Sequence, residues 1–580
     1  MSLTGALQIG RSALNASQLA IQVAGNNVAN AATPGFTRQS AVLAPTQDAR
    51  FGGQFIGRGV EVAGIRRQID SALQARLLSG NAGEQAAQTD LRLISGVEAL
   101  LDGLGENNVA TQLDRFFASF SELANSPAAE GARSLVVQQG QALGSFVQNL
   151  RAQLLDQRVQ IDRELGAAVT GANDLLTRIA ELNTAIVTAE QGRGSAGSLR
   201  DQRDQLLSQL AETLDITAIE QPSGAVDVLV GSTPIVLAGQ SRGVRLRLRA
   251  DGDQLSADVV TADRSEVIPV RSGSIGSLLT QRTAAVDQTV ERLDQLSAQL
   301  IFQVNRAHSQ GLTAEPLTSV TADRAVTLPD QARALNDPAN TAFAPLPFAP
   351  TSGSFTVTVR NAQTGSSQSA QVQIDLDGIT AAGAAGFADD TSLDSLRASL
   401  GSVANLTATI GADGRLRVEA APGFEVSFGD DTSGVLAVLG VNTFFSGTDA
   451  ATIGVRPELL SRPNLLAAGR VSQGVPSDNA TALEIAGLRQ RPIPELGGVT
   501  FLGQFDQTVQ SVAVRVGAAR TASQAALTVR QNLEAQRAAV SGVSLDEEAI
   551  NLINFQSQYQ ASARFISTVE ELTQALLALI

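Results

Sequence analysis

Length, composition and charge limit the chemistry that this chain can perform. Its 580 residues, 43% of them apolar, are enough for several compact domains, yet they include only one histidine and neither cysteine nor lysine. These absences exclude Schiff-base lysine chemistry, Cys–His pairs and multi-histidine metal sites, and a net charge of −15 with scattered arginines argues against nucleic-acid binding. We therefore expect no enzyme, and we expect no catalytic residue, cofactor or bound metal.

Hydropathy argues against a membrane protein. No apolar run approaches the roughly 20 residues that a membrane-spanning helix needs. The N-terminal segment lacks both a basic start and a continuous apolar stretch. We expect neither a membrane anchor nor a cleaved secretory signal.

The first predicted element is an amphipathic helix near the N-terminus. Two stripes repeat along it at heptad spacing, an apolar one at Leu7, Leu14, Ile21 and Val28 and a small-residue one at Gly10, Ser17 and Ala24. The helix is predicted to end between residues 26 and 32, where asparagines favour local hydrogen bonds and Thr33-Pro34-Gly35 forms a typical turn sequence.

Longer helices and two β-rich regions follow. Apolar residues three and four apart predict one long helix over about 134–190 and a second helix that folds back on it. The apolar period changes to two over about 214–275, which indicates a small β unit, and becomes helical again from Val286 to Val304. Residues 313–459 are rich in Thr, Gly, Asp and Ala, with alternating segments typical of strands.

The helical pattern resumes near residue 506 and continues to the C-terminus. The last helix is predicted to start with a capping box, in which Ser544 and Glu547 each accept a hydrogen bond from a free amide. Asp546, Glu547 and Glu548 suit the positive end of this helix. Its apolar stripe includes Leu552, Tyr559, Ile566 and Leu576.

These elements predict an α+β fold with a long α-helical core. The N- and C-terminal segments would form this core and a terminal coiled coil, with β-rich outer domains inserted. The predicted domains are a polymerisation domain of terminal helices (1–70 with 530–580), a helical core (71–312 with 460–529, including the β unit at about 214–275) and an inserted β-rich outer domain (313–459).

The apolar stripes at the chain ends predict contacts between subunits. A helix with one apolar stripe is stabilised mainly by packing against other elements. We expect the terminal helices to pack on each other and on neighbouring subunits, through Leu7, Leu14, Ile21, Val28, Leu552, Tyr559, Ile566 and Leu576.

At both ends the sequence resembles the axial proteins of the bacterial flagellum. Their N-terminal signature is similar to residues 26–39, with matching positions at Asn26, Asn27, Asn30, Thr33, Pro34, Gly35, Phe36 and Arg38. Phe36 stands where tyrosine is commoner in these proteins. Further stretches resemble the FlgK-type hook-associated proteins in particular, at 273–279, 304–311, 444–450 and 541–561.

This resemblance implies a structural subunit at the junction between hook and filament that is required for filament assembly. The implied partners are copies of the chain in a ring-like or helical layer, the hook protein, a second hook–filament junction protein and an export chaperone at the C-terminal helix. It also implies secretion by the flagellar type III pathway without a cleaved signal.

Two alternatives remain open. The chain could be another axial subunit, such as a hook or flagellin-like protein. It could also be a secreted adhesin that acts through the β insertion, for which the acidic pair Asp430 and Asp431 would be the residues to test. The lone His308 is more simply a capping or packing residue than a ligand or base.

Overall fold

The chain forms two compact units, each assembled from segments that are distant in sequence. The computed structural model describes residues 3–51, 54–102, 108–191, 194–251, 254–472 and 475–578. Unit 1 comprises Met1–Leu93, Gln160–Arg282 and Val516–Ile580, and unit 2 comprises Ile94–Val159 and Thr283–Arg515. Three long helices have residues in both units: α2 (Ser71–Asp102), α4 (Glu130–Glu190) and α13 (Phe501–Ser541).

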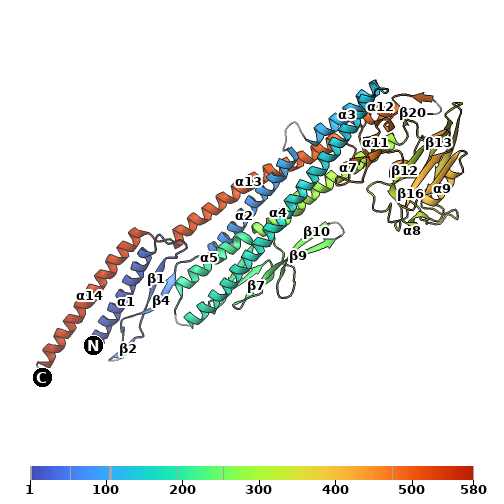
Figure 1. Ribbon diagram of the computed structural model, residues 1–580. Coiled ribbons are helices and arrows are strands. Elements are labelled where there is room, and N and C mark those ends of the chain that lie inside the picture. Colours follow the sequence, from blue (N-terminus) through green and yellow to red (C-terminus); the bar gives the residue numbers. More distant parts are fainter. Residues whose placement is uncertain are drawn as a thin grey trace. The chain divides into compact units, whose positions relative to one another are not determined.

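The two ends of the chain pack on each other in unit 1. Helix α1 (Leu3–Ala29) lies beside α14 (Leu545–Leu577), as Figure 1 shows. Small side chains allow the close approach, since Gly10, Ala16 and Ala20 of α1 are all buried. A Cβ atom placed on Gly10 would lie only 2.6 Å from Cγ1 of Ile566, so a larger residue there would push the two helices apart.

A β arm follows α1. Strand β1 (Gln39–Pro45) pairs antiparallel with β4 (Val60–Arg67), from Gln39 opposite Arg67 to Pro45 opposite Val60. Between them β2 (Ala49–Phe51) pairs with β3 (Gln54–Ile56). Both β1 and β4 also contact α1, so the arm continues the packing of the terminal helices.

The rest of unit 1 combines helices with small sheets. Helix α5 (Gly197–Thr213) folds back beside the end of α4, and α6 (Gly273–Gln281) contacts α5. Leu73 and Leu77 of α2 form a buried cluster with Leu533 of α13. The strands pair in the order β5 (Ile216–Glu220), β6 (Val226–Val230), β7 (Thr233–Leu237) and β8 (Gln240–Ser241), and separately as β9 (Val244–Asp251) with β10 (Gln254–Thr261).

Unit 2 has an aromatic core between helices. Helix α3 (Val109–Asn125) and α7 (Gln288–His308) both contact α12 (Ala480–Gly487), and a π-helical turn, η1 (Arg282–Asp287), precedes α7. The rings of Phe444 and Phe445 meet edge to face at 4.7 Å, an arrangement favoured by the ring quadrupoles. The fully buried rings of this core are Phe116, Phe117, Phe120, Phe444, Phe445 and Phe501.

The β-rich part of unit 2 includes two three-stranded sheets and several short helices. One sheet has the order β12 (Ser319–Ala325), β16 (Arg415–Ala420), β15 (Leu406–Ile410), and the other has the order β14 (Ser367–Ile374), β13 (Gly353–Asn361), β17 (Phe424–Gly429). The remaining elements of unit 2 are β11 (Leu312–Thr313), α8 (Leu328–Gln331), α9 (Leu393–Gly401), α10 (Val435–Leu439), β18 (Phe445–Ser446), β19 (Gly454–Val455), α11 (Pro457–Ser461), η2 (Pro463–Leu465), β20 (Ala467–Ser472), β21 (Val475–Ser477) and η3 (Pro494–Leu496).

The predicted fold class is confirmed. The chain is α+β, with long helices from both ends and the sheets in inserted segments. Helix α1 ends at Ala29, within the predicted interval, and α4 covers 61 residues, or about 90 Å at 1.5 Å per residue. The β unit expected at about 214–275 contains β5 to β10. The domain boundaries stay a prediction.

Candidate functional site: the joint between the two chain ends

The signature residues after α1 form a compact turn. Asn30 donates from Nδ2 to the Asn26 carbonyl at 2.9 Å and to Asn26 Oδ1 at 3.0 Å, and Thr33 Oγ1 donates to Asn30 Oδ1 at 3.2 Å. Gly35 has φ of 80°, a left-handed conformation that favours glycine. The asparagines therefore end the helix by the local bonding that the sequence predicted.

Asn27 is buried and clamps the start of the β arm. Its Oδ1 accepts from the Gln39 amide at 3.0 Å, and its Nδ2 donates to the Gln39 carbonyl at 2.8 Å. The same Nδ2 also donates to Oε2 of Glu548 at 3.2 Å. Only a side-chain amide offers an acceptor and a double donor at this size, which explains why asparagine suits the position.

Arg38 links the N-terminal signature to the start of the C-terminal helix. Its Nε lies 2.7 Å from Oε1 of Glu548, and its Nη1 lies 2.7 Å from Oε2 of Glu547. The Arg38 amide also donates to the Ser541 carbonyl at 3.0 Å. Because the Glu548 side chain is only 3% exposed, this charge-assisted pair is largely withdrawn from solvent. We call Asn27, Arg38, Glu547 and Glu548 the terminal joint.

The predicted capping box forms only in part. Ser544 Oγ accepts from the Glu547 amide at 3.4 Å, as expected for an N-cap. The Glu547 carboxylate binds Arg38 instead of turning back to the Ser544 amide. A charged partner offers a stronger hydrogen bond than a neutral amide, so the acidic first turn of α14 has a tertiary role in addition to its interaction with the helix dipole.

A second group of contacts ties the signature to α5. The Thr37 amide donates to Asp201 Oδ2 at 3.4 Å, and Nη2 of Arg67 lies 2.7 Å from Asp201 Oδ1 and also pairs with Asp204. Gln205 donates to the Pro34 carbonyl. Burial raises the pKa of the Asp201 carboxyl, and the nearby Arg67 charge partly offsets this effect. The segment that contains Phe36, which is half-buried, is thus anchored on both sides.

The sequence did not identify the partners of the signature. Asp201, Arg67 and Glu548 were not predicted as part of one site, although Glu548 was noted as a helix-end charge. Nothing periodic links residue 38 to residue 548, which are 510 positions apart. The available signal was the acidic residues that follow the N-cap serine. They were interpreted only as charges that suit the positive end of the helix, which left out their pairing with Arg38.

The predicted interface residues differ in their environments. On α1, Leu7, Leu14 and Ile21 are half-buried and Val28 is exposed, whereas the small-residue stripe, Gly10, Ser17 and Ala24, is buried. On α14, Leu552 and Ile566 are half-buried, and Ile566 lies against Gly10 of the same chain. Tyr559 and Leu576 are exposed. Further exposed apolar residues of α14 were not predicted: Ile550, Ile553, Phe565, Leu572 and Leu577.

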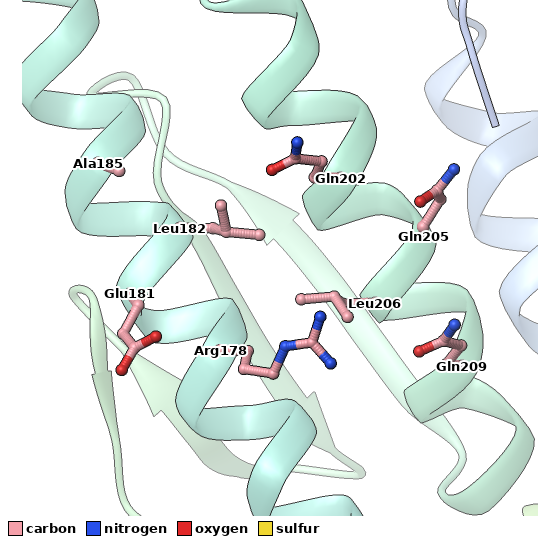
Figure 2. Close-up of a pocket in the computed structure, with 8 residues that line it drawn as sticks. All are labelled: Arg178, Glu181, Leu182, Ala185, Gln202, Gln205, Leu206 and Gln209. Carbon is pink, nitrogen blue, oxygen red and sulfur yellow. The ribbon is translucent and has the colours of Figure 1, made fainter. Parts of the chain in front are cut away.

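A groove of about 410 Å³ lies between α4 and α5 in unit 1. Figure 2 shows Leu182 and Leu206 pointing toward each other across it, with Arg178 between the two helices. The rest of its lining consists of Glu181, Ala185, Gln202, Gln205 and Gln209. This lining has no nucleophile next to a general base, so its geometry indicates no reaction.

His308 and Asp431, two residues of unit 2 that were candidates from the sequence, have structural roles. His308 is fully buried, with Nδ1 2.8 Å from the Asn442 carbonyl and Nε2 accepting from the Ala467 amide at 3.0 Å. Asp431 is buried and accepts from the amides of Ser433, Gly434 and Leu436, so this aspartate holds a turn and is not available to a surface ligand. Along the described ranges of the chain, no helix is both long and apolar enough to cross a membrane.

Family models of flagellar proteins match three parts of the chain. Three family models match: the helical domain of flagellar hook-associated protein FlgK at residues 94–319, the C-terminal region of the flagellar basal body rod FlgEFG proteins at 534–579, and the flagella basal body rod protein at 7–37. The last two matches contain the two sides of the terminal joint, Asn27 and Glu548.

Curated relatives match from end to end. Flagellar hook-associated protein 1 of Salmonella typhimurium is 26% identical over 598 residues, and that of Escherichia coli is 25% identical over 574 residues, each alignment covering 98% of both chains. The Bacillus subtilis protein of the same name is 26% identical, covering 98% of this chain and 96% of its own. The structure of the flagellar hook junction protein FlgK from Burkholderia pseudomallei aligns with a TM-score of 0.49 at 15% identity, over 80% of this chain and 100% of that one. The chain is thus similar from end to end to flagellar hook-associated protein 1, and its residues 94–319 match the helical domain of FlgK.

Proposed function

We propose that this chain is a structural subunit of the bacterial flagellum at the junction between hook and filament, and that its terminal helices form the polymerising surface. The observation that carries the proposal is the combination of a closed terminal joint with an exposed apolar face on α14. The joint fixes α1 to α14 within one subunit. Because α1 and α14 are held together, the exposed apolar residues of α14 belong to one ordered surface.

Several large apolar side chains of α14 are exposed in the single subunit. Ile553 is 61% exposed and Leu572 is 55% exposed, and both lie on a helix whose other side already packs on α1. Large apolar side chains that are exposed along one helix indicate a site of protein–protein interaction. Copies of the chain in a ring-like or helical layer would cover it.

The further partners rest on the family relationship. We include the hook protein, a second hook–filament junction protein and an export chaperone that holds the C-terminal helix before assembly. The exposed apolar residues of α14 support the chaperone, since they need cover in a subunit that is not yet assembled. Secretion by the flagellar type III pathway without a cleaved signal, and a structural role without catalysis, belong to the same proposal.

The test is complementation of a gene deletion in a flagellated host. Without the gene, cells should carry hooks but lack filaments and should release flagellin into the medium, as seen by electron microscopy and by immunoblotting of the medium. The wild-type gene should restore filaments. Normal filaments in the deletion strain would contradict the proposed function.

A charge on the exposed face should separate assembly from folding. Leu572→Glu is expected to abolish filament formation in the complemented strain, because an unpaired charge in an assembled interface costs several kcal/mol. Its helix content by circular dichroism should stay that of the wild type, since Leu572 is exposed in the subunit. Ile566 is less suitable because it packs on Gly10 within the chain.

Gln574→Glu is the matched control, since it places the same charge at an exposed polar position two residues away. It should assemble normally. If Leu572→Glu also assembles normally, the polymerising surface lies elsewhere, although the role at the junction would stand if the deletion strain lacks filaments.

A further inference from the structure

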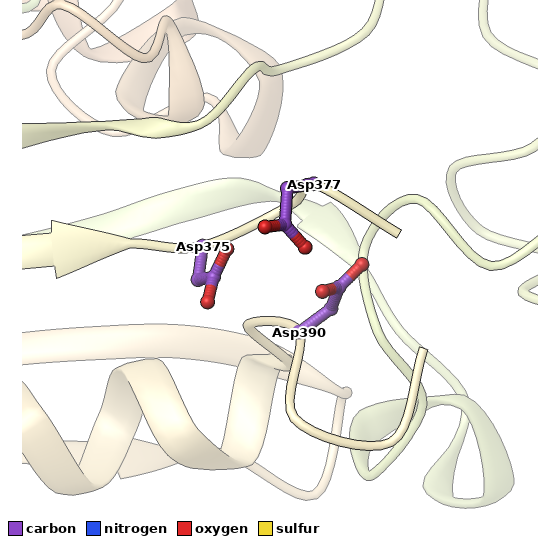
Figure 3. Close-up of side chains that lie close together, drawn as sticks. All are labelled: Asp375, Asp377 and Asp390. Carbon is purple, nitrogen blue, oxygen red and sulfur yellow. The ribbon is translucent and has the colours of Figure 1, made fainter. Parts of the chain in front are cut away.

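Three aspartates converge in the β-rich part of unit 2, away from the terminal joint. Asp375 and Asp377 follow the edge strand β14, and Asp390 lies at the other end of the loop, before α9. One carboxylate oxygen from each lies within 4.8 Å of the others. Figure 3 shows the carboxylate of Asp390 pointing toward those of Asp375 and Asp377.

Asp390 is buried and only half of its carboxylate has a donor. The residue is 6% exposed, and its Oδ2 accepts from Asn336 Nδ2 at 2.5 Å and from the Gly378 amide at 3.1 Å. Its Oδ1 is buried and has no hydrogen-bond donor, and the same is true of Oδ1 of Asn336. A buried carboxylate oxygen that lacks a donor is a costly arrangement, and a cation bound at the three carboxylates would satisfy it.

The backbone holds the loop in this geometry. The Asp375 amide donates to Thr391 Oγ1 at 2.9 Å, and the Thr391 amide donates to the Asp375 carbonyl at 2.7 Å. These bonds fix the two ends of the loop side by side. The Ile379 amide donates to Asp377 Oδ1 at 2.8 Å, which turns this carboxylate back toward the loop.

No positive side chain compensates the three carboxylates. Over the ranges that the structure describes, no ion pair joins Asp375, Asp377 or Asp390 to an arginine. Like charges at this separation repel, and the burial of Asp390 strengthens the effect. A divalent cation would neutralise most of this charge.

We propose that Asp375, Asp377 and Asp390 bind one Ca²⁺ ion. All the donors are oxygens, which Ca²⁺ and Mg²⁺ prefer, and because Asp375 and Asp377 are exposed, water can complete the coordination. Ca²⁺ accepts irregular sets of six to eight oxygens, whereas Mg²⁺ demands near-octahedral geometry. No metal was expected from the sequence, which has no cysteine and a single histidine and does not show that Asp375, Asp377 and Asp390 converge.

The test is calorimetric titration of the full-length protein, stripped of metal by a chelator, with CaCl₂ and in parallel with MgCl₂. We expect one Ca²⁺ per chain with a Kd of about 10⁻⁴–10⁻³ M, the range of extracellular modules with few charged ligands, and weaker Mg²⁺ binding. Asp377→Asn, at an exposed position that need not disturb the fold, should weaken Ca²⁺ binding at least about tenfold.

Asp389→Asn is the matched control. It removes the same charge from an exposed position next to Asp390, but Asp389 is not part of the cluster. It should bind Ca²⁺ like the wild type. The proposal is overturned by the absence of saturable Ca²⁺ binding up to about 10 mM, well above the expected range. It is equally overturned if Asp377→Asn binds as tightly as Asp389→Asn, and a tighter Mg²⁺ complex would overturn the assignment to Ca²⁺.

Discussion

Arg38→Met should lower the free energy needed to open the terminal joint by about 3–5 kcal/mol, the usual cost of leaving a buried charge without its partner. Among the residues that the structure describes, the Glu548 carboxylate, with a side chain 3% exposed, would keep only the Asn27 amide as a side-chain donor. Methionine preserves the aliphatic packing of arginine, so the loss reports on the charge. Hydrogen exchange of the backbone amides in the first turns of α14 measures this loss. These amides should exchange about 10²- to 10⁴-fold faster than in the wild type.

Glu547→Gln is the internal comparison for this experiment. The Glu547 side chain contacts the same arginine but is 61% exposed, so its loss should cost less than about 1 kcal/mol. Equal effects of the two substitutions would mean that the joint behaves as an ordinary surface ion pair. The presence of Arg38 in the N-terminal signature would then need another physical explanation.

Acidification should destabilise unit 2 through His308. Burial lowers the pKa of this imidazole from 6.5 to about 4, and the charges of Arg133 and Arg456 act in the same direction. Protonation would also place a second N–H against the Ala467 amide, which now donates to Nε2. Because the unfolded chain takes up its proton first as pH falls through 6.5, the stability from neutral His308 is complete above pH 6.5 and is lost progressively down to about pH 4.

The expected loss is about 3 kcal/mol, since each unit of pKa difference corresponds to 1.36 kcal/mol. Urea denaturation at several pH values between 7 and 4 measures it. A His308→Gln variant retains polar groups but cannot titrate, so its stability should depend less on pH by that amount, and the comparison cancels the effects of all other groups. Parallel pH curves for the two proteins would show that His308 does not control acid stability.

The helical architecture could be predicted because it follows from local periods. Each of these signals depends only on residues nearby in the sequence. Examples are the heptad spacing of Leu7 and Leu14, the asparagines that end α1 and the serine at the start of α14. The same holds for the alternation in β13, where Phe355 and Val357 point into the core. These signals need no knowledge of what lies across the fold.

The partners across the fold could not be predicted in this way. Nothing in the spacing of α14 says that Ile566 faces Gly10 while Leu572 stays exposed, because the helix carries apolar residues on more than one side. The same is true of Asp390, whose burial depends on how a loop closes over Asn336. Pairings such as Arg38 with Glu548 depend on the whole chain topology, and one sequence does not contain that information locally.

The 510-residue separation between Arg38 and Glu548 also determines when in synthesis and folding these two residues can pair. A chain that emerges N-terminus first presents Arg38 and Asn27 early, but their carboxylate arrives only with the last few dozen residues. Closing so large a loop is entropically slow and comes late in folding. A chain that lacks the start of α14 therefore leaves Arg38 without Glu547 and Glu548, and only a chain that carries both of its ends can close the terminal joint.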